Sequence, residues 1–194
     1  MKVRKVLPAL VCLTLVTFGF ADAVDISLGL SGEGVVKDNT IKAGKPVSVD
    51  IYVENDSLFT GFSFGFTISS PDIKTITHVA DSGNGLNKNG DIKGYNGWQD
   101  HSIWNFGGVY TVERDWDGKL PDLIGFGGLC VQQEYKPHPK EKVLSFQLMA
   151  DSPGTIVVDS SFYPPGGRWL FATPKPGASN DPTFQGGLKI TVVK

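Results

Sequence analysis

Apolar and polar residues alternate along much of the chain with a period of two, which is the spacing of side chains on one face of a β-strand. The segment VSVDIYV, residues 47–53, puts valine and isoleucine on one face and Ser48, Asp50 and Tyr52 on the other. The segment GFSFGFTIS, residues 61–69, alternates phenylalanine and isoleucine with smaller residues in the same way. We therefore predict a half-buried strand in each segment.

Weaker alternation recurs along the rest of the chain. It predicts strands at residues 24–30, 73–79, 102–106, 109–112, 124–130, 143–150, 155–160, 169–172 and 188–193. Turn signals such as AGKP, SSPD, DSPG and PPGG separate these stretches, and no stretch has the period of an amphipathic helix. Many short strands at near-regular spacing predict an all-β fold, an antiparallel β-sandwich.

The N-terminus has the three parts of a secretory signal peptide. A basic start with Lys2, Arg4 and Lys5 precedes the apolar run 6–20, and a small-residue cleavage site ends at Ala23. The apolar run is shorter than the roughly 20 residues that span a bilayer. We predict a signal peptide at residues 1–23, a secreted protein without a membrane span after cleavage, and one domain at residues 24–194.

Charge and cysteine content narrow the possible partners and the sources of stability. Removing the three signal-peptide cations and Asp22 from 18 basic and 20 acidic residues leaves 15 and 19, a net charge of −4. No basic block remains to neutralise phosphates, so a nucleic acid partner is not expected. Cys130 is the one cysteine of the mature chain, which excludes an internal disulfide. Its alternating apolar surroundings favour a buried thiol over pairing between chains.

The segment ERDWDGKLPD carries four carboxylates around a glycine: Glu113, Asp115, Asp117 and Asp122. Carboxylates at alternate positions beside a glycine turn can wrap oxygens around a calcium ion. Ile124 stands where an EF-hand loop would carry its bidentate glutamate, so the match is partial. Asp-Gly and Pro-Asp are also good turn formers, and a solvated acidic turn is the alternative.

No set of residues predicts catalysis. The segment GFSFG matches the G-x-S-x-G nucleophile motif, but Ser63 lies inside an alternating strand with no helix pattern after it. The three histidines, His78, His101 and His138, are far apart and show no metal-ligand spacing. We therefore predict that the protein is not an enzyme.

The longest break in alternation is the Gly, Asn and Asp-rich stretch 80–101, which contains Tyr95 and Trp98. A loop of this length in a compact domain is usually functional, and exposed aromatic rings can stack on sugars or anchor a protein partner. Trp116 occupies the acidic segment described above. These three aromatic residues are candidate ligand-binding residues, with core packing as the alternative for each.

The segment VDSSFYPPGGRWLF, residues 158–171, contains a cluster of proline and glycine that predicts a turn between two strands. Trp169 is expected to enter the core. Tyr163 and Arg168 flank the turn, where a planar ring and a guanidinium group could also contact a ligand. Both are further candidate binding residues.

The segment IKAGKPVSVDIYVENDSLFTGFSFGFTIS, residues 41–69, resembles the opening of bacterial cohesin-like domains. The later segments DWDGKLPDLIGFGG, SPGTIVVDSSFYPPGGRWLF and FQGGLKITVV resemble the acidic turn, paired strands and closing strand of the same modules. The resemblance implies a jelly-roll β-sandwich of a bacterial extracellular protein that binds rather than catalyses, through a sheet face or its rim loops. It implies as partner a dockerin-like protein or another surface component, and the related architecture of carbohydrate-binding modules adds polysaccharide as the alternative.

Overall fold

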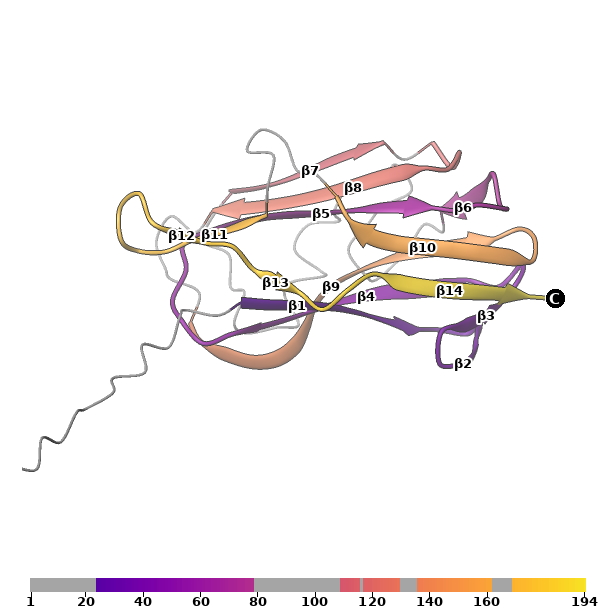
Figure 1. Ribbon diagram of the computed structural model, residues 1–194, viewed down its shortest axis with the longest axis horizontal. Coiled ribbons are helices and arrows are strands. Elements are labelled where there is room, and N and C mark those ends of the chain that lie inside the picture. Colours follow the sequence, from indigo (N-terminus) through magenta and orange to yellow (C-terminus); the bar gives the residue numbers. More distant parts are fainter. Residues whose placement is uncertain (1–23, 79–108, 116, 130–135, 162–168) are drawn as a thin grey trace, which may run out of the picture.

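The computed structural model describes residues 24–78, 109–115, 117–129, 136–161 and 169–194 (Figure 1). These residues form two β-sheets and contain no helix, so the predicted all-β sandwich is confirmed, with jelly-roll architecture. Consistent with this, no helix in the described residues is long and apolar enough to cross a bilayer.

The five-stranded sheet has the order β13-β1-β4-β9-β6. Its strands are β1 (Val24–Ser31), β4 (Val47–Asn55), β6 (Ile76–His78), β9 (His138–Ala150) and β13 (Thr183–Phe184). The long strand β4 lies at its centre and pairs antiparallel with β1 and with β9.

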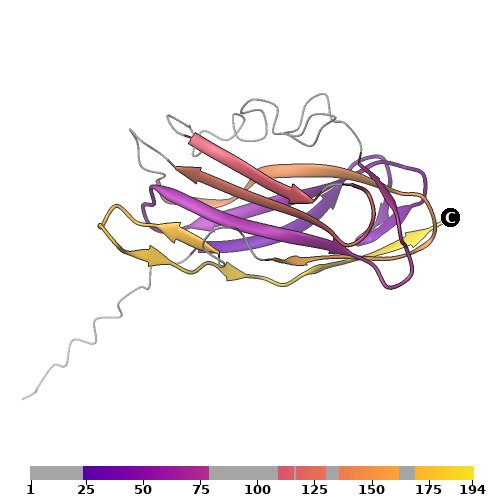
Figure 2. The ribbon, with the colours of Figure 1, turned by 90° about the horizontal axis from the view of Figure 1, so that it is seen from above.

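The nine-stranded sheet follows the order β12-β11-β5-β10-β14-β3-β2, and β8 joins it by pairing with both β5 and β7. Its strands are β2 (Val35–Lys37), β3 (Thr40–Lys42), β5 (Gly61–Ser69), β7 (Val109–Asp115), β8 (Asp122–Leu129), β10 (Gly154–Ser160), β11 (Leu170–Ala172), β12 (Ser179–Asn180) and β14 (Leu188–Val193). Figure 2 shows β7, β8 and β5 as neighbouring ribbons of one layer.

Most pairings are antiparallel, as predicted, and two are parallel. Strand β1 pairs parallel with β13, and β14 pairs parallel with β3. Parallel neighbours cannot be joined by a tight hairpin, so these two contacts bring together segments that are far apart in sequence.

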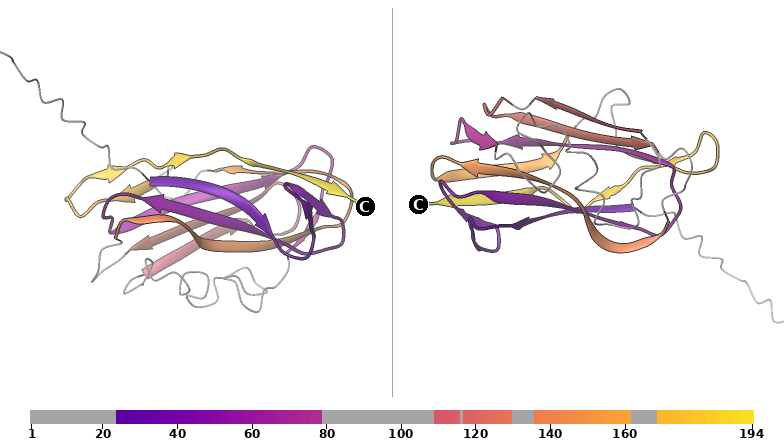
Figure 3. Two further views of the ribbon diagram at one scale, coloured as in Figure 1. Left: turned by 90° about the horizontal axis from the view of Figure 1, so that it is seen from below. Right: turned by 180° about the vertical axis from the view of Figure 1, so that it is seen from behind.

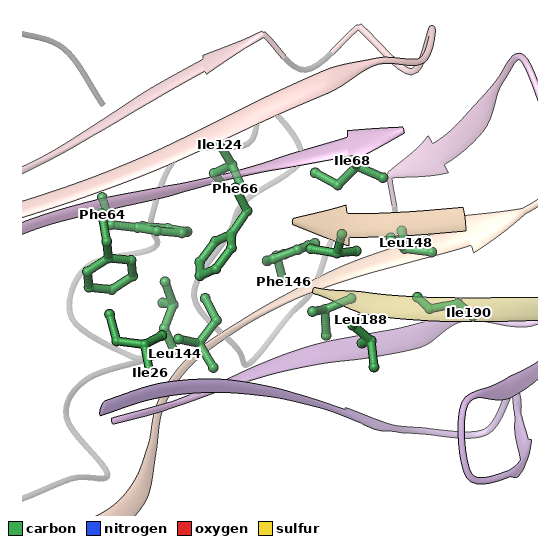
Figure 4. Packing of buried hydrophobic residues seen from close by; sticks show 14 of the residues in the cluster. Ile26, Phe64, Phe66, Ile68, Ile124, Leu144, Phe146, Leu148, Leu188 and Ile190 are labelled. Atoms are coloured by element: carbon green, nitrogen blue, oxygen red, sulfur yellow. The ribbon is translucent and has the colours of Figure 1, made fainter. Parts of the chain in front are cut away.

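The inner faces of the two sheets form one hydrophobic core. Phe64 and Phe66 of β5 point toward Ile26 of β1 and toward Leu144 and Phe146 of β9 (Figure 4). All five of these side chains are buried. This packing follows directly from the alternation, since the apolar residues of each strand share one face.

Some strand boundaries differ from the sequence prediction. Strands β2, β3, β12 and β13, of two or three residues each, were not predicted. The stretch predicted as a strand at 73–79 contains the shorter β6, and Ile73 is instead held by Ser70 Oγ, which accepts its N–H at 2.7 Å. The strand predicted at 102–106 lies outside the described residues.

The prediction that β4 is half-buried is wrong at two positions. Ser48 and Asp50, assigned to its polar face, are only 6% and 2% exposed. The polar face of β4 is covered in part by long side chains of its neighbours: Lys142 of β9 reaches Asp50, with Nζ 3.6 Å from Oδ1. Alternation reports which residues share a face, and it does not report what covers that face.

Candidate docking face

The outer surface of β5, β8 and β11 is built from small and aliphatic residues, and we call it the docking face. Its members are Gly61, Ser63, Gly65, Thr67, Leu123, Gly125, Gly127, Leu170 and Ala172. They face outward because the residues between them in each strand, mostly phenylalanine and isoleucine, point into the core.

The strand register sets the pattern of this face. Ser63 lies between Gly127 of β8 and Leu170 of β11. The next outward pair, Gly65 and Gly125, has no side chains and is itself buried. The partly exposed members are all uncharged, namely Ser63, Thr67, Leu123, Gly127, Leu170 and Ala172.

A layer of aromatic rings supports the docking face from below. Phe62 stacks on Phe64, with ring centroids 5.5 Å apart, and on Phe171 at 6.0 Å. Trp169 packs edge-on against Phe66 at 5.2 Å, and its Nε1 donates a hydrogen bond to the Ser161 carbonyl oxygen at 2.8 Å. Trp169 was expected to enter the core; it is partly buried and packs against the core.

The glycine at position 128 is required by one of these rings. A Cβ atom built at Gly128 would lie 2.4 Å from Phe62 Cε1 and 2.6 Å from Phe62 Cζ. The two residues are direct cross-strand partners, so the ring of Phe62 occupies the space that a side chain at position 128 would need.

The outer face of the five-stranded sheet is different, because polar side chains already contact one another there. Lys142 pairs with Asp50, and Lys140 Nζ lies 5.3 Å from the centre of the Tyr52 ring. The Tyr52 ring also covers Gly29, where an added Cβ atom would lie 3.1 Å from Tyr52 Cε2. Burial, and then the nearby Asp50 carboxylate, raise the pKa of Tyr52 above its usual value.

The predicted calcium ligands fall at the connection between β7 and β8. Asp117 is exposed, and its Oδ1 accepts the Lys119 backbone N–H at 2.8 Å while its Oδ2 lies 3.5 Å from Lys119 Nζ. Asp122 is buried at 1% exposure and is the strand partner of Ile68. The Asp117 carboxylate thus closes a turn around Gly118, which has φ 80°.

The other two predicted calcium ligands, Glu113 and Asp115, belong to β7. The structure describes the backbone pairing of this strand. Glu113 is the strand partner of Gly125, and Asp115 that of Leu123. Among the described side chains, no group of three His, Cys, Asp or Glu residues is placed to hold a metal ion. The calcium site stays a prediction.

The predicted ligand-binding residues lie outside the described residues, and so do the predicted signal peptide and Cys130. The residues concerned are Tyr95, Trp98, Trp116, Tyr163 and Arg168. Their role in binding stays a prediction.

Ser63 and His138 were considered for catalysis and lie in described strands, whereas His101 lies outside the described residues. Ser63 lies in the middle of a regular strand, not at the strand-to-helix turn that a nucleophile elbow needs. His138 Nδ1 lies 3.1 Å from Glu141 Oε2 and 2.9 Å from the Pro139 carbonyl oxygen. The irregular pairing at the start of β9 brings Glu141 beside this histidine, although the two residues are three positions apart.

The residues of the docking face were not among the predicted binding residues, which were chosen from loops, although the family resemblance implied a sheet face or its rim loops. A signal was present: the outward positions of GFSFGFTIS and of LIGFGG are glycine, serine, threonine and leucine, which is unusual for a solvated sheet face. Only the pairing of β5 with β8 and β11 shows that these positions form one surface.

Comparisons with known proteins place the fold. No family model matches the chain, and no curated protein does. Among solved structures, a type II cohesin domain from the cellulosome of Acetivibrio cellulolyticus superposes with a TM-score of 0.54 at 12% identity, covering 87% of this chain and 95% of the cohesin. The seventh ScaB type I cohesin of Pseudobacteroides cellulosolvens gives 0.53 at 12% identity, covering 88% and 92%.

A third match is the ScaC cohesin of Acetivibrio cellulolyticus solved in complex with the ScaB dockerin, with a TM-score of 0.53, 12% identity and coverage of 88% and 99%. The sequence resemblance is therefore confirmed at the level of the fold. The chain has a cohesin-like jelly-roll sandwich.

Proposed function

We propose that this protein is a secreted, non-catalytic recognition module that binds another extracellular or cell-surface protein through the docking face. A dockerin-like protein is the first candidate partner. The cohesin-like fold supports this choice, since one of the similar cohesins was solved with a dockerin bound.

The observation that carries the proposal is the arrangement of Leu123 and Leu170 on the docking face. Both leucines are partly exposed, and the partly exposed residues between them, Ser63 and Gly127, are small. Small residues let a helix or strand of a partner approach closely and bury the two leucines, which is how the apolar centre of a protein interface forms.

Recognition is favoured over catalysis by the same geometry. The serine with a nucleophile-like motif belongs to the docking face, where Ser63 lies between two neighbouring strands. Such a face is suited to binding, because its backbone is held by sheet hydrogen bonds on both sides.

The docking face is also favoured over a sugar-binding surface. Sugar rings stack on exposed aromatic faces. The large hydrophobic side chains exposed in the described residues are aliphatic, namely Val36, Leu58 and Val193, whereas the described phenylalanines and Trp169 pack in or against the core.

Export is proposed from the N-terminal sequence, with cleavage after Ala23. N-terminal sequencing of the protein recovered from culture medium is expected to begin at Val24. Recovery of the intact chain in the membrane fraction contradicts export.

The binding proposal is tested with the mature chain, residues 24–194, immobilised and exposed to secreted proteins of its source and, separately, to a panel of polysaccharides. A captured protein is then purified and its affinity measured. Leu123→Glu and Leu170→Glu are each expected to weaken binding by about 2 kcal/mol, roughly thirtyfold, because each buries a charge at the centre of the interface.

The matched control is Leu58→Glu, because Leu58 is also a solvent-accessible leucine, 38% exposed, and lies in the connection between β4 and β5. It is expected to leave the affinity unchanged. Equal losses in all three variants, or no loss in any, exclude the docking face. Retention of polysaccharide without any protein supports the carbohydrate-binding alternative instead.

A further inference from the structure

A second surface lies at the other end of the nine-stranded sheet from the docking face, on the outer face of β14, β3 and β2. We call it the basic face, and it is formed by Lys37, Lys42 and Lys189 together with Val36 and Val193. Figure 3 shows the β2–β3 hairpin beside the end of β14. Strand β10 separates this region from the docking face.

Strand register brings residues from distant segments onto the basic face. Lys42 of β3 is the parallel partner of Val193 of β14, and Thr40 is the partner of both Thr191 and Lys37. The residues that alternate with them are buried in the core: Ile41, Ile190 and Val192. The lysines and threonines therefore point to solvent, and all three lysines are exposed.

The dimensions of the basic face suit a short peptide segment. Lys189 precedes Val193 by four residues of β14, a distance of roughly 13 Å at about 3.3 Å per residue. The three strands lie about 5 Å apart, so the ammonium groups spread over an area roughly 13 Å long and 10 Å wide.

The lysines of the basic face have no ion-pair partner among the described carboxylates. Three lysines elsewhere contact an acid: Lys45 with Glu33, Lys119 with Asp117 and Lys142 with Asp50. Lys37, Lys42 and Lys189 have no such contact within the described part of the chain. Their ammonium groups are therefore available to an external anion.

Two exposed acids border the basic face without cancelling its charge. Asp38 lies in the β2–β3 turn. Asp159 of β10 lies two positions along the strand from Val157, the partner of Lys189, and its Oδ1 accepts the Ser160 backbone N–H at 2.7 Å. Strands β2, β3, β10 and β14 and the β2–β3 turn together carry three exposed lysines, Lys37, Lys42 and Lys189, against these two carboxylates, a net positive charge.

The basic face also carries two of the most exposed aliphatic side chains in the described residues. Val36 is 60% exposed and Val193 is 37% exposed. Val36 is exposed because the pairing of β2 with β3 is irregular between Val35 and Lys37, which leaves Val36 without a strand partner. A surface that combines cations with aliphatic groups complements a ligand that combines anions with aliphatic groups.

We infer that the basic face binds an acidic protein segment that also contains aliphatic side chains. A polypeptide supplies both kinds of group, whereas an acidic polysaccharide supplies charge without the aliphatic contacts. This contact does not depend on the docking face, and the two surfaces can hold different partners at once.

The experiment measures binding of a fluorescently labelled peptide of alternating glutamate and valine to the mature chain by anisotropy, in low and in moderate salt. The wild type is expected to bind saturably and more weakly as salt rises. The triple variant Lys37→Glu, Lys42→Glu, Lys189→Glu is expected to bind at least about tenfold more weakly, because three exposed charge contacts are lost together. Circular dichroism checks that the variant is folded.

The matched control reverses the charge of three exposed lysines outside the face, Lys74, Lys136 and Lys175, and is expected to keep most of the affinity. The double variant Val36→Ser, Val193→Ser is expected to weaken peptide binding while leaving binding of a sulfated polysaccharide unchanged. The inference is overturned by an equal loss in the control, by the absence of saturable binding, or by insensitivity to the valine changes.

Discussion

Gly128→Ala tests how tightly the aromatic layer beneath the docking face is packed. The new methyl group would lie 2.4 Å and 2.6 Å from two carbon atoms of the Phe62 ring. Ordinary contact between carbon atoms begins near about 3.5 Å, so the ring or the strand must shift by about 1 Å.

The ring has little room to shift. Phe62 is 4% exposed and is stacked against Phe64 and Phe171 at 5.5 Å and 6.0 Å. Overpacking of a filled core costs about 1–3 kcal/mol, while replacing glycine by alanine in a strand returns roughly 0.5 kcal/mol of backbone entropy. We expect Gly128→Ala to lower the free energy of unfolding by about 2 kcal/mol.

A double-mutant cycle separates this clash from other causes. Phe62→Leu alone is expected to cost about 1.5 kcal/mol, and it removes the two ring atoms that the methyl group meets. In the Phe62→Leu background, Gly128→Ala is then expected to be nearly neutral, giving a coupling of about 2 kcal/mol.

The free energies come from urea denaturation followed by far-ultraviolet circular dichroism, with the m-value checked for constancy. Two results refute the reasoning: a cost of Gly128→Ala below about 0.5 kcal/mol, or costs of the two substitutions that simply add.

The contacts of Asp50, Tyr52 and the acidic turn can be tested in the same way. Lys142→Met leaves the 2% exposed Asp50 without its ion-pair partner. Urea denaturation is expected to show that the free energy of unfolding falls by about 2 kcal/mol, which is less than the loss for a fully buried ion pair because Lys142 is partly exposed. The pKa of Tyr52 is raised in the folded protein, so the contribution of its phenol group to the free energy of unfolding is complete below about pH 10 and is lost as the pH rises through the folded pKa. The free energy of unfolding of the Tyr52→Phe variant is therefore expected to fall less over this pH range than that of the wild type. If calcium binds at the acidic turn, millimolar calcium raises the melting temperature and a chelator lowers it, whereas an equal shift in an Asp115→Ala, Asp117→Ala variant contradicts the site.

The sequence by itself determined the longer strands and the inner face of each. In GFSFGFTIS, the positions of Phe62, Phe64 and Phe66 follow from a period of two, which is a local property of an extended chain. The same holds for the turns, where proline and glycine restrict or permit backbone angles within a few residues. These features need no knowledge of what lies across the sheet.

The tertiary structure decided which outward positions share a surface. Lys42 and Lys189 belong to one face only because β3 and β14 pair parallel, a contact between the early and the last part of the chain. Likewise, Gly128 is constrained by Phe62, and Asp50 is buried beside Lys142. Each of these relations depends on register between distant strands, and register is set by the packing of the whole core, which a local pattern does not contain.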